Sequence, residues 1–179
     1  MIDKKEIDLK EIKLLGGIGF VCIYVMPIVG LVLILVALKK LADATEKPNI
    51  FRDFLTASVI AVVWFFLIFL YLVICPHLFS NGGSGELTPD VGLLLFVGGL
   101  FLTWIFATVS AHYMSKSLFT VAEVTKEQLL AQAARLISFG ALLTIVLIGP
   151  IVIFVGIIYA IVAFFSLPDK VVIEEVGQT

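Results

Sequence analysis

Histidine and carboxylate side chains are the groups from which proton-transfer or metal chemistry would be built, and this 179-residue chain keeps them out of the interiors of its apolar runs. His77 and His112 lie near the ends of two such runs. No aspartate pair, HExxH motif or serine–histidine constellation is present, and no Gly-Lys-Ser/Thr sequence follows the glycines after residue 81. Ionisable groups inside a membrane mark ion or proton paths. We therefore expect a non-enzymatic protein with no catalytic residues.

The sequence also offers few residues for binding a metal ion, a cofactor or a nucleic acid. Cys22 and Cys75 do not form a CxxC motif or a cysteine–histidine pattern, so we expect neither a metal site nor a cofactor. The net charge of −2 does not favour nucleic-acid binding through a basic face. The expected partners are membrane lipids, further copies of the chain or another membrane protein.

Composition predicts a membrane protein. The chain is 61% hydrophobic and 15% charged, with a mean hydropathy of +1.16, whereas soluble domains average about 45–50% apolar and about 25% charged residues. Apolar runs of about 20 residues match the hydrocarbon thickness of a bilayer. The sequence therefore predicts an all-α, multi-pass bundle of about four spans in the cell membrane.

The runs and their connectors define the expected organisation. A charged N-terminal segment covers 1–13, one transmembrane bundle covers 14–167, and an acidic tail covers 168–179. Within the bundle we expect a cytoplasmic helix over 121–135 and spans over 14–38, 53–75, 91–114 and 136–166.

The first and last runs carry prolines near their centres. Pro27 interrupts the first run, and Gly149-Pro150 interrupts the last. Membrane helices tolerate proline as a kink because neighbouring groups satisfy the freed carbonyls. We expect two proline-kinked spans. The alternative is that both runs turn back as re-entrant hairpins, whose limbs of about 11–17 residues are too short to span.

Charge counting and backbone solvation favour different topologies. The 76–90 connector has no Lys or Arg and the 115–135 connector has three, which places the former outside and the latter inside the cell. Hairpins would put all twelve basic residues inside, whereas a spanning first run leaves four lysines outside. However, non-helical backbone at membrane depth must be covered, and two hairpins leave only two spans to cover it. We therefore favour kinked spans.

The two proline-containing runs can be aligned with each other as an internal repeat. A shift of 123 positions aligns Gly17 with Gly140 and Pro27 with Pro150. Paired Gly/Pro-interrupted segments point to binding sites in transporters, so the candidate structural or gating residues are Pro27, Pro150, Gly17, Gly140 and Gly149. Small residues let membrane helices pack closely, and the candidate packing residues are Gly92, Gly99, Ala107 and Gly156.

Two functions follow from these features. The absence of polar groups in the spans and the small-residue packing faces favour a protein that organises the membrane or a complex. The Gly/Pro-interrupted repeat supports the alternative, a channel or carrier for a small solute.

Three segments carry a family resemblance: residues 14–19 (LLGGIG), residues 37–41 (ALKKL) leading to 50–52 (IFR), and residues 161–167 (IVAFFSL). With them, the chain resembles a family of small, uncharacterised integral membrane proteins, found mostly in archaea and in some bacteria, that is grouped as a domain of unknown function. The resemblance covers nearly the whole chain. It implies membrane residence and no established activity, and it transfers no functional residue.

Overall fold

A computed structural model describes residues 4–80, 89–146 and 148–174. These residues form six α-helices, a short 3-10 helix and a two-stranded ribbon, so the all-α class is confirmed for the body of the protein. In chain order the elements are β1 (Lys4–Asp8), α1 (Lys10–Val25), α2 (Pro27–Thr45), α3 (Asn49–Ser80), α4 (Pro89–Thr125), α5 (Gln128–Leu143), η1 (Thr144–Val146), α6 (Gly149–Ser166) and β2 (Lys170–Glu174).

Among the residues that the structure describes, three helices are long and apolar enough to cross a membrane. They are the Asn49–Tyr71 part of α3, the Val97–Thr125 part of α4, and α6. The first two overlap the predicted spans 53–75 and 91–114. Helix α5 is also apolar but falls below that length.

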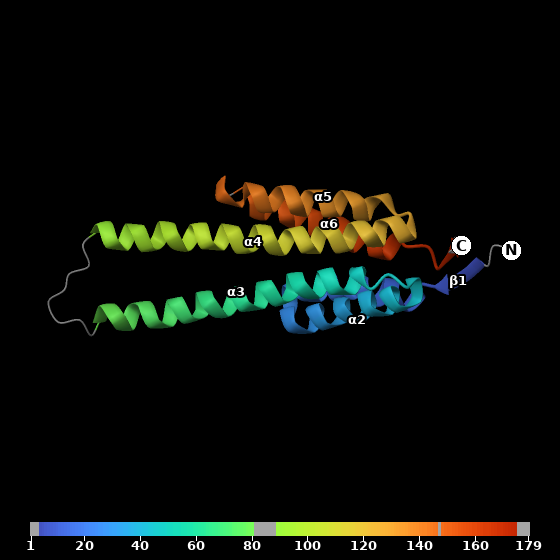
Figure 1. Cartoon of the computed structure of the whole chain (residues 1–179), viewed down its shortest axis with the longest axis horizontal. Coiled ribbons are helices and arrows are strands. Elements are labelled where there is room, and N and C mark those ends of the chain that lie inside the picture. Colours follow the sequence, from blue (N-terminus) through green and yellow to red (C-terminus); the bar gives the residue numbers. More distant parts are fainter. Residues whose placement is uncertain (1–3, 81–88, 147, 175–179) are drawn as a thin grey trace, which may run out of the picture.

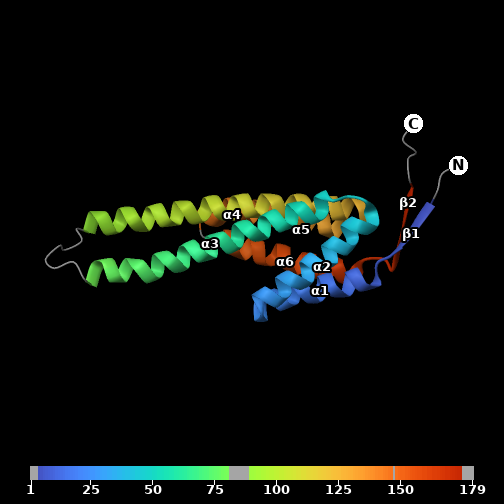
Figure 2. The same cartoon turned by 60° about the horizontal axis from the view of Figure 1, so that its bottom comes forward.

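The first proline-containing run, 14–38, is two helices in the structure, where the sequence predicts one kinked span. Helix α1 ends at Val25, the non-helical residue Met26 connects, and α2 begins at Pro27 and returns beside α1 (Figure 2). The physical reason lies in the position of the proline. At the first position of a helix its missing N–H would have no intrahelical partner anyway, so proline begins a helix there without cost.

The last run, 136–166, also folds back. Helix α5 ends at Leu143, η1 follows, and α6 runs antiparallel to α5 from Gly149, with Pro150 in its first turn. The predicted separate helix 121–135 is divided between the end of α4 and the start of α5. The break falls at Lys126, whose φ of 55° ends the α4 helix. Both proline-containing runs thus fold back as helical hairpins in the structure.

The two hairpins flank a pair of long helices. Helices α3 and α4 lie side by side; the α1–α2 hairpin packs on α3 through α2, and the α5–α6 hairpin packs on α4 through α5 (Figure 1). The hairpins meet each other where α1 contacts α6. At that contact the fully buried rings of Phe20 and Phe164 lie 5.4 Å apart.

The chain ends meet at one end of this assembly. Strand β1 pairs antiparallel with β2, with Lys4 opposite Glu174 and Asp8 opposite Lys170. The Leu9 amide extends the ribbon by donating to the Asp169 carbonyl at 2.8 Å. Residues 4–8 of the charged N-terminal segment and residues 170–174 of the tail therefore form one ribbon, which projects from the end where the hairpins begin (Figure 2).

Candidate functional site

The limbs of the first hairpin cross at a glycine pair. A Cβ placed on Gly30 of α2 would lie 2.4 Å from the Ile23 amide nitrogen and 2.6 Å from the Gly19 carbonyl oxygen. A Cβ on Gly19 would lie 2.7 Å from the Ile34 side chain and 2.9 Å from its amide nitrogen. Both glycines are buried. The two backbones are in direct contact, and any side chain at Gly30 would separate them.

The second hairpin repeats this crossing. A Cβ on Gly140 of α5 would lie 2.7 Å from the Ile153 side chain, 2.8 Å from the Ile153 amide nitrogen and 3.0 Å from the Gly149 carbonyl oxygen. A Cβ on Gly149 would lie 2.2 Å from both the Gly140 carbonyl oxygen and the Thr144 amide nitrogen. Gly140 and Gly149, two predicted structural residues, therefore meet at one point of the fold.

The residues that are structurally equivalent in the two hairpins differ from those that the internal repeat aligns in sequence. Gly140 occupies the environment of Gly19, a shift of 121 positions, and Gly149 occupies the environment of Gly30, a shift of 119. The sequence alignment at a shift of 123 positions instead pairs Gly17 with Gly140. The second tip is two residues shorter between its glycines, so no single shift aligns both limbs.

Three other candidate residues of the repeat and one candidate packing residue, Gly156, have different surroundings. Pro27 and Pro150 are exposed in the first turns of α2 and α6. Gly17 is buried where α1 meets α6, and a Cβ there would lie 2.7 Å from the Phe165 ring. Gly156 packs on α5, where a Cβ would lie 2.9 Å from the Ile137 side chain.

The candidate packing residues of α4 that the structure describes make fewer close contacts with other helices. A Cβ on Gly99 would meet nothing within 4 Å, and Ala107 is half-buried. Gly92 is helical, and its surroundings lie outside the described residues. Among the candidate packing residues, Gly156 is the one that the structure places in close contact between helices.

Hydrogen bonds from α4 fix the level of the second hairpin. The Trp104 indole nitrogen donates to the Leu142 carbonyl oxygen at 3.3 Å, close to the hairpin tip. Further along α4, the Ser115 hydroxyl donates to the Ala134 carbonyl oxygen at 2.9 Å. Leu142 and Ala134 are both on α5. Sequence reasoning missed these two donors, because a tryptophan or serine within an apolar run does not reveal its partner.

A buried carboxylate joins α3 to α4 at the charged end. Asp53 is 3% exposed, and its Oδ2 lies 3.4 Å from the Lys116 Nζ. The neighbouring Ser117 hydroxyl donates to the Ile50 carbonyl oxygen at 2.7 Å. An ion pair also links α1 to α2, between Glu11 and Lys40. The charged groups thus connect α3 to α4 and α1 to α2 near the charged end of the molecule.

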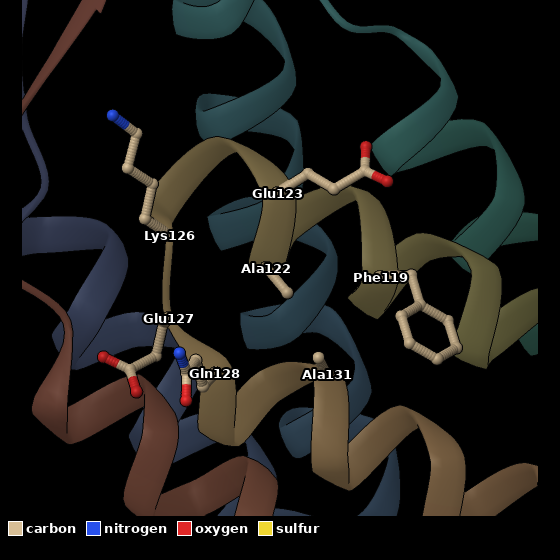
Figure 3. A pocket seen from close by; sticks show the side chains of 7 residues that line it. All are labelled: Phe119, Ala122, Glu123, Lys126, Glu127, Gln128 and Ala131. Carbon is tan, nitrogen blue, oxygen red and sulfur yellow. The ribbon is translucent and has the colours of Figure 1, made fainter.

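A shallow pocket of about 250 Å³ lies at the turn between α4 and α5. Figure 3 shows that the charged side chains lining it, those of Glu123, Lys126 and Glu127, point in different directions. Glu127 is engaged in capping α5, since its carboxylate accepts from the Leu129 amide at 3.3 Å. In the described part of the chain, no group of three or more His, Cys, Asp or Glu residues could hold a metal ion.

Two long helices flanked by two glycine-crossed hairpins, with three helices long enough to cross a membrane, define the architectural class of the protein. A family model described as "Protein of unknown function (DUF996)" matches residues 26–158, and the chain belongs to this family. It is also 34% identical over 174 residues to "Uncharacterized protein MJ1644" of the archaeon Methanocaldococcus jannaschii, covering 92% of this chain and 96% of that protein. No solved structure matches. The resemblance to an uncharacterised archaeal family is confirmed.

The glycine crossing predicts opposite effects of alanine at two helical glycines. Alanine favours a helix over glycine by about 1 kcal/mol, so Gly98→Ala, where a Cβ meets nothing within 4 Å, should leave the stability unchanged or raise it. Gly30→Ala must force the backbones apart and should lower the free energy of unfolding by about 1–3 kcal/mol, as overpacking does. Thermal unfolding in detergent, followed by circular dichroism, measures both. Equal effects of the two substitutions would contradict the crossing.

Proposed function

We propose that this protein is an integral membrane protein in which α3 and α4 cross the bilayer, while the two hairpins enter and leave from the charged side. Its exposed surface supports this, because large apolar side chains are exposed around the helices where a soluble protein would present polar ones. The most exposed include Val25 at 78%, Ile28 at 80%, Phe65 at 67% and Ile151 at 66%.

The level of the hairpin tips supports partial insertion. The indole of Trp104 contacts the tip of α5, and Lys116 lies further along α4 at the charged end. At about 1.5 Å per residue, these two residues are about 18 Å apart along the helix. In the first hairpin, Lys13 to Met26 corresponds to about 20 Å in the same way. Both tips would therefore lie within a hydrocarbon core about 30 Å thick, with the tip of the second hairpin further from the charged end than that of the first (Figure 1).

Helix α6 is long enough to cross a membrane, but its pairing with α5 supports a different placement. Gly156 packs beside Ile137, which is only two residues from Arg135. The second half of α6 therefore lies level with the polar start of α5. About ten residues of α6 remain for the hydrocarbon core, which corresponds to about 15 Å.

The charge distribution supports one orientation. With both hairpins folded back, the segments that carry the twelve Lys and Arg residues, 4–13, 39–52, 116–135 and 170, lie toward the end of the molecule where the hairpins begin (Figure 1). Basic residues in short loops favour the cytoplasmic side. Both chain ends would then be cytoplasmic, and the 81–88 connection would lie on the opposite side.

We further propose a non-enzymatic role, in which the protein organises the bilayer or a membrane complex. The observation that carries this is the pair of short apolar hairpins packed beside the two long helices, which the proposed topology places inside the membrane. Two hydroxyls on α4 are engaged in the fold: those of Ser110 and Ser117 donate to carbonyl oxygens of α3 at 3.0 and 2.7 Å. The buried hydroxyl of Thr108 on the same helix has no hydrogen-bond partner among the described residues. The partners would be lipids, a second copy or another membrane protein.

A channel or carrier for a small solute is the second candidate. The repeated glycine crossing supports it, because transporters place interrupted repeats around their binding sites. The prolines Pro27 and Pro150 would then mark the moving elements.

Cysteine accessibility tests the topology. In a background with both native cysteines replaced by serine, Gly83→Cys should react from outside with an impermeant maleimide, whereas Lys10→Cys and Lys126→Cys should react only after permeabilisation. Labelling of all three in denaturant is the control. Reaction of Lys10→Cys together with Gly83→Cys would contradict the hairpins, because a spanning first run places these residues on one side.

Reconstitution in liposomes separates the two functions. The organising role predicts that flux of protons and small solutes equals that of protein-free vesicles. Solute flux that is present in the native protein and lost in the Pro27→Ala, Pro150→Ala double variant would instead establish the channel or carrier.

A further inference from the structure

We propose that the protein is a one-sided wedge that favours membranes curved so that its charged side is convex. This inference rests on the proposed membrane topology and names what the hairpins do there. The partner is the acyl-chain region of the leaflet on the charged side, which the hairpins enter and the opposite leaflet lacks.

The two halves of the molecule differ in helix number. From the charged end to the tip of the first hairpin, the described chain places all six helices side by side. The α5–α6 hairpin reaches further along α4, to the level of Trp104, and beyond that level α3 and α4 continue alone (Figures 1 and 2). In the proposed topology the hairpins would therefore add helix area to the leaflet on the charged side, whereas α3 and α4 contribute to both leaflets. Unequal area bends a bilayer toward the less filled leaflet.

The tips present the chemistry of acyl chains. Val25, Met26 and Ile28 at the first tip are 78%, 59% and 80% exposed, and neither α3 nor α4 covers them. At the second tip, Ile148 and Ile151 are 55% and 66% exposed. None of these side chains carries a charge, so each can contact hydrocarbon directly.

The backbone of the tips can also lie in hydrocarbon, where unsatisfied polar groups are excluded. In the first hairpin the Met26 amide donates to the Cys22 carbonyl oxygen at 2.7 Å, and the Gly30 amide donates to the Met26 carbonyl oxygen at 2.9 Å. In the second, the Ile151 amide donates to the Ile148 carbonyl oxygen at 3.1 Å. These bonds satisfy the Met26, Gly30 and Ile151 amides within the turns.

A wedge must resist compression, and the packing of the hairpins provides this. The glycine crossings hold the two limbs of each hairpin in backbone contact, so the limbs cannot approach further. The Phe164 ring packs where a Cβ on Gly16 would lie, 2.3 Å from that position, and so locks α6 against α1. Lateral pressure on the hairpins therefore acts on a rigid body.

The test measures sorting of the full-length protein between flat and curved membrane. A fluorophore on Lys126→Cys reports the protein in giant vesicles from which thin tubes are pulled outward. With the charged end outside, the tube-to-vesicle density ratio should exceed unity. With the charged end inside, the ratio should fall below unity, because the same wedge then faces the concave leaflet.

Paired variants identify the tips as the cause. Ile28→Lys with Ile151→Lys places charge at both tips, which draws them toward the interface and should bring the ratio to unity. Leu14→Lys with Val162→Lys is the matched control, because it adds the same charge at exposed positions near the charged end. The control should sort like the native protein.

Two further measurements distinguish a failure of the wedge proposal from a failure of the proposed membrane topology. Carbonate extraction and cysteine labelling are measured on the same samples. If carbonate extracts the protein from the membrane, or if Lys10→Cys reacts on the same side as Gly83→Cys, the proposed topology is wrong. A protein with the correct topology but a ratio of unity in both orientations overturns the wedge alone. Crosslinking of the two tips between copies also overturns it, because a second copy then covers them.

Discussion

Backbone contact between the limbs of each hairpin, at Gly19 with Gly30 and at Gly140 with Gly149, is the constraint on which the rest of the structure depends. Helices in a membrane gain little from hydrophobic burial against one another and depend on close packing of small residues. The crossings provide that packing next to the turn. They convert two apolar runs, each long enough to be a span, into pairs of shorter antiparallel helices.

The hairpins become one body with the long helices through contacts of a different kind. Phe164 joins the hairpins by filling the space that Gly16 leaves, and the indole of Trp104 and the hydroxyl of Ser115 bind α5 to α4 through its carbonyl oxygens. The buried carboxylate of Asp53 beside Lys116 joins α3 to α4. Polar groups thus serve to fix positions, and the resulting body is broad at its charged end and narrow beyond the tips.

The sequence predicted the helical class and the two long helices, because apolar length and composition determine these directly, and it predicted the family through three short segments such as residues 14–19. It did not distinguish a kink from a helix start at Pro27, since both accommodate the missing N–H. Charge counting favoured hairpins, but the need to cover backbone at membrane depth was given more weight. The first hairpin weakens that objection, because its connection is the single residue Met26, whose amide donates to the Cys22 carbonyl oxygen and whose carbonyl oxygen accepts from the Gly30 amide.

The repeat shows a second limit of sequence reasoning. A constant shift aligned the prolines, but the fold aligns the glycines, and the tips differ by two residues in length. The terminal ribbon of β1 and β2 was likewise absent from the prediction, because its pairing requires the two chain ends to meet, which only the folded hairpins bring about.

The distance between the two ends of the first apolar run tests the hairpin most directly. Spin labels at Leu14 and Lys39, both exposed, would be measured by double electron–electron resonance in lipid nanodiscs. A hairpin with helix axes about 8–10 Å apart predicts a short distance, below about 20 Å including the labels. A single span, at about 1.5 Å per residue, places them about 38 Å apart, and that result would contradict the account.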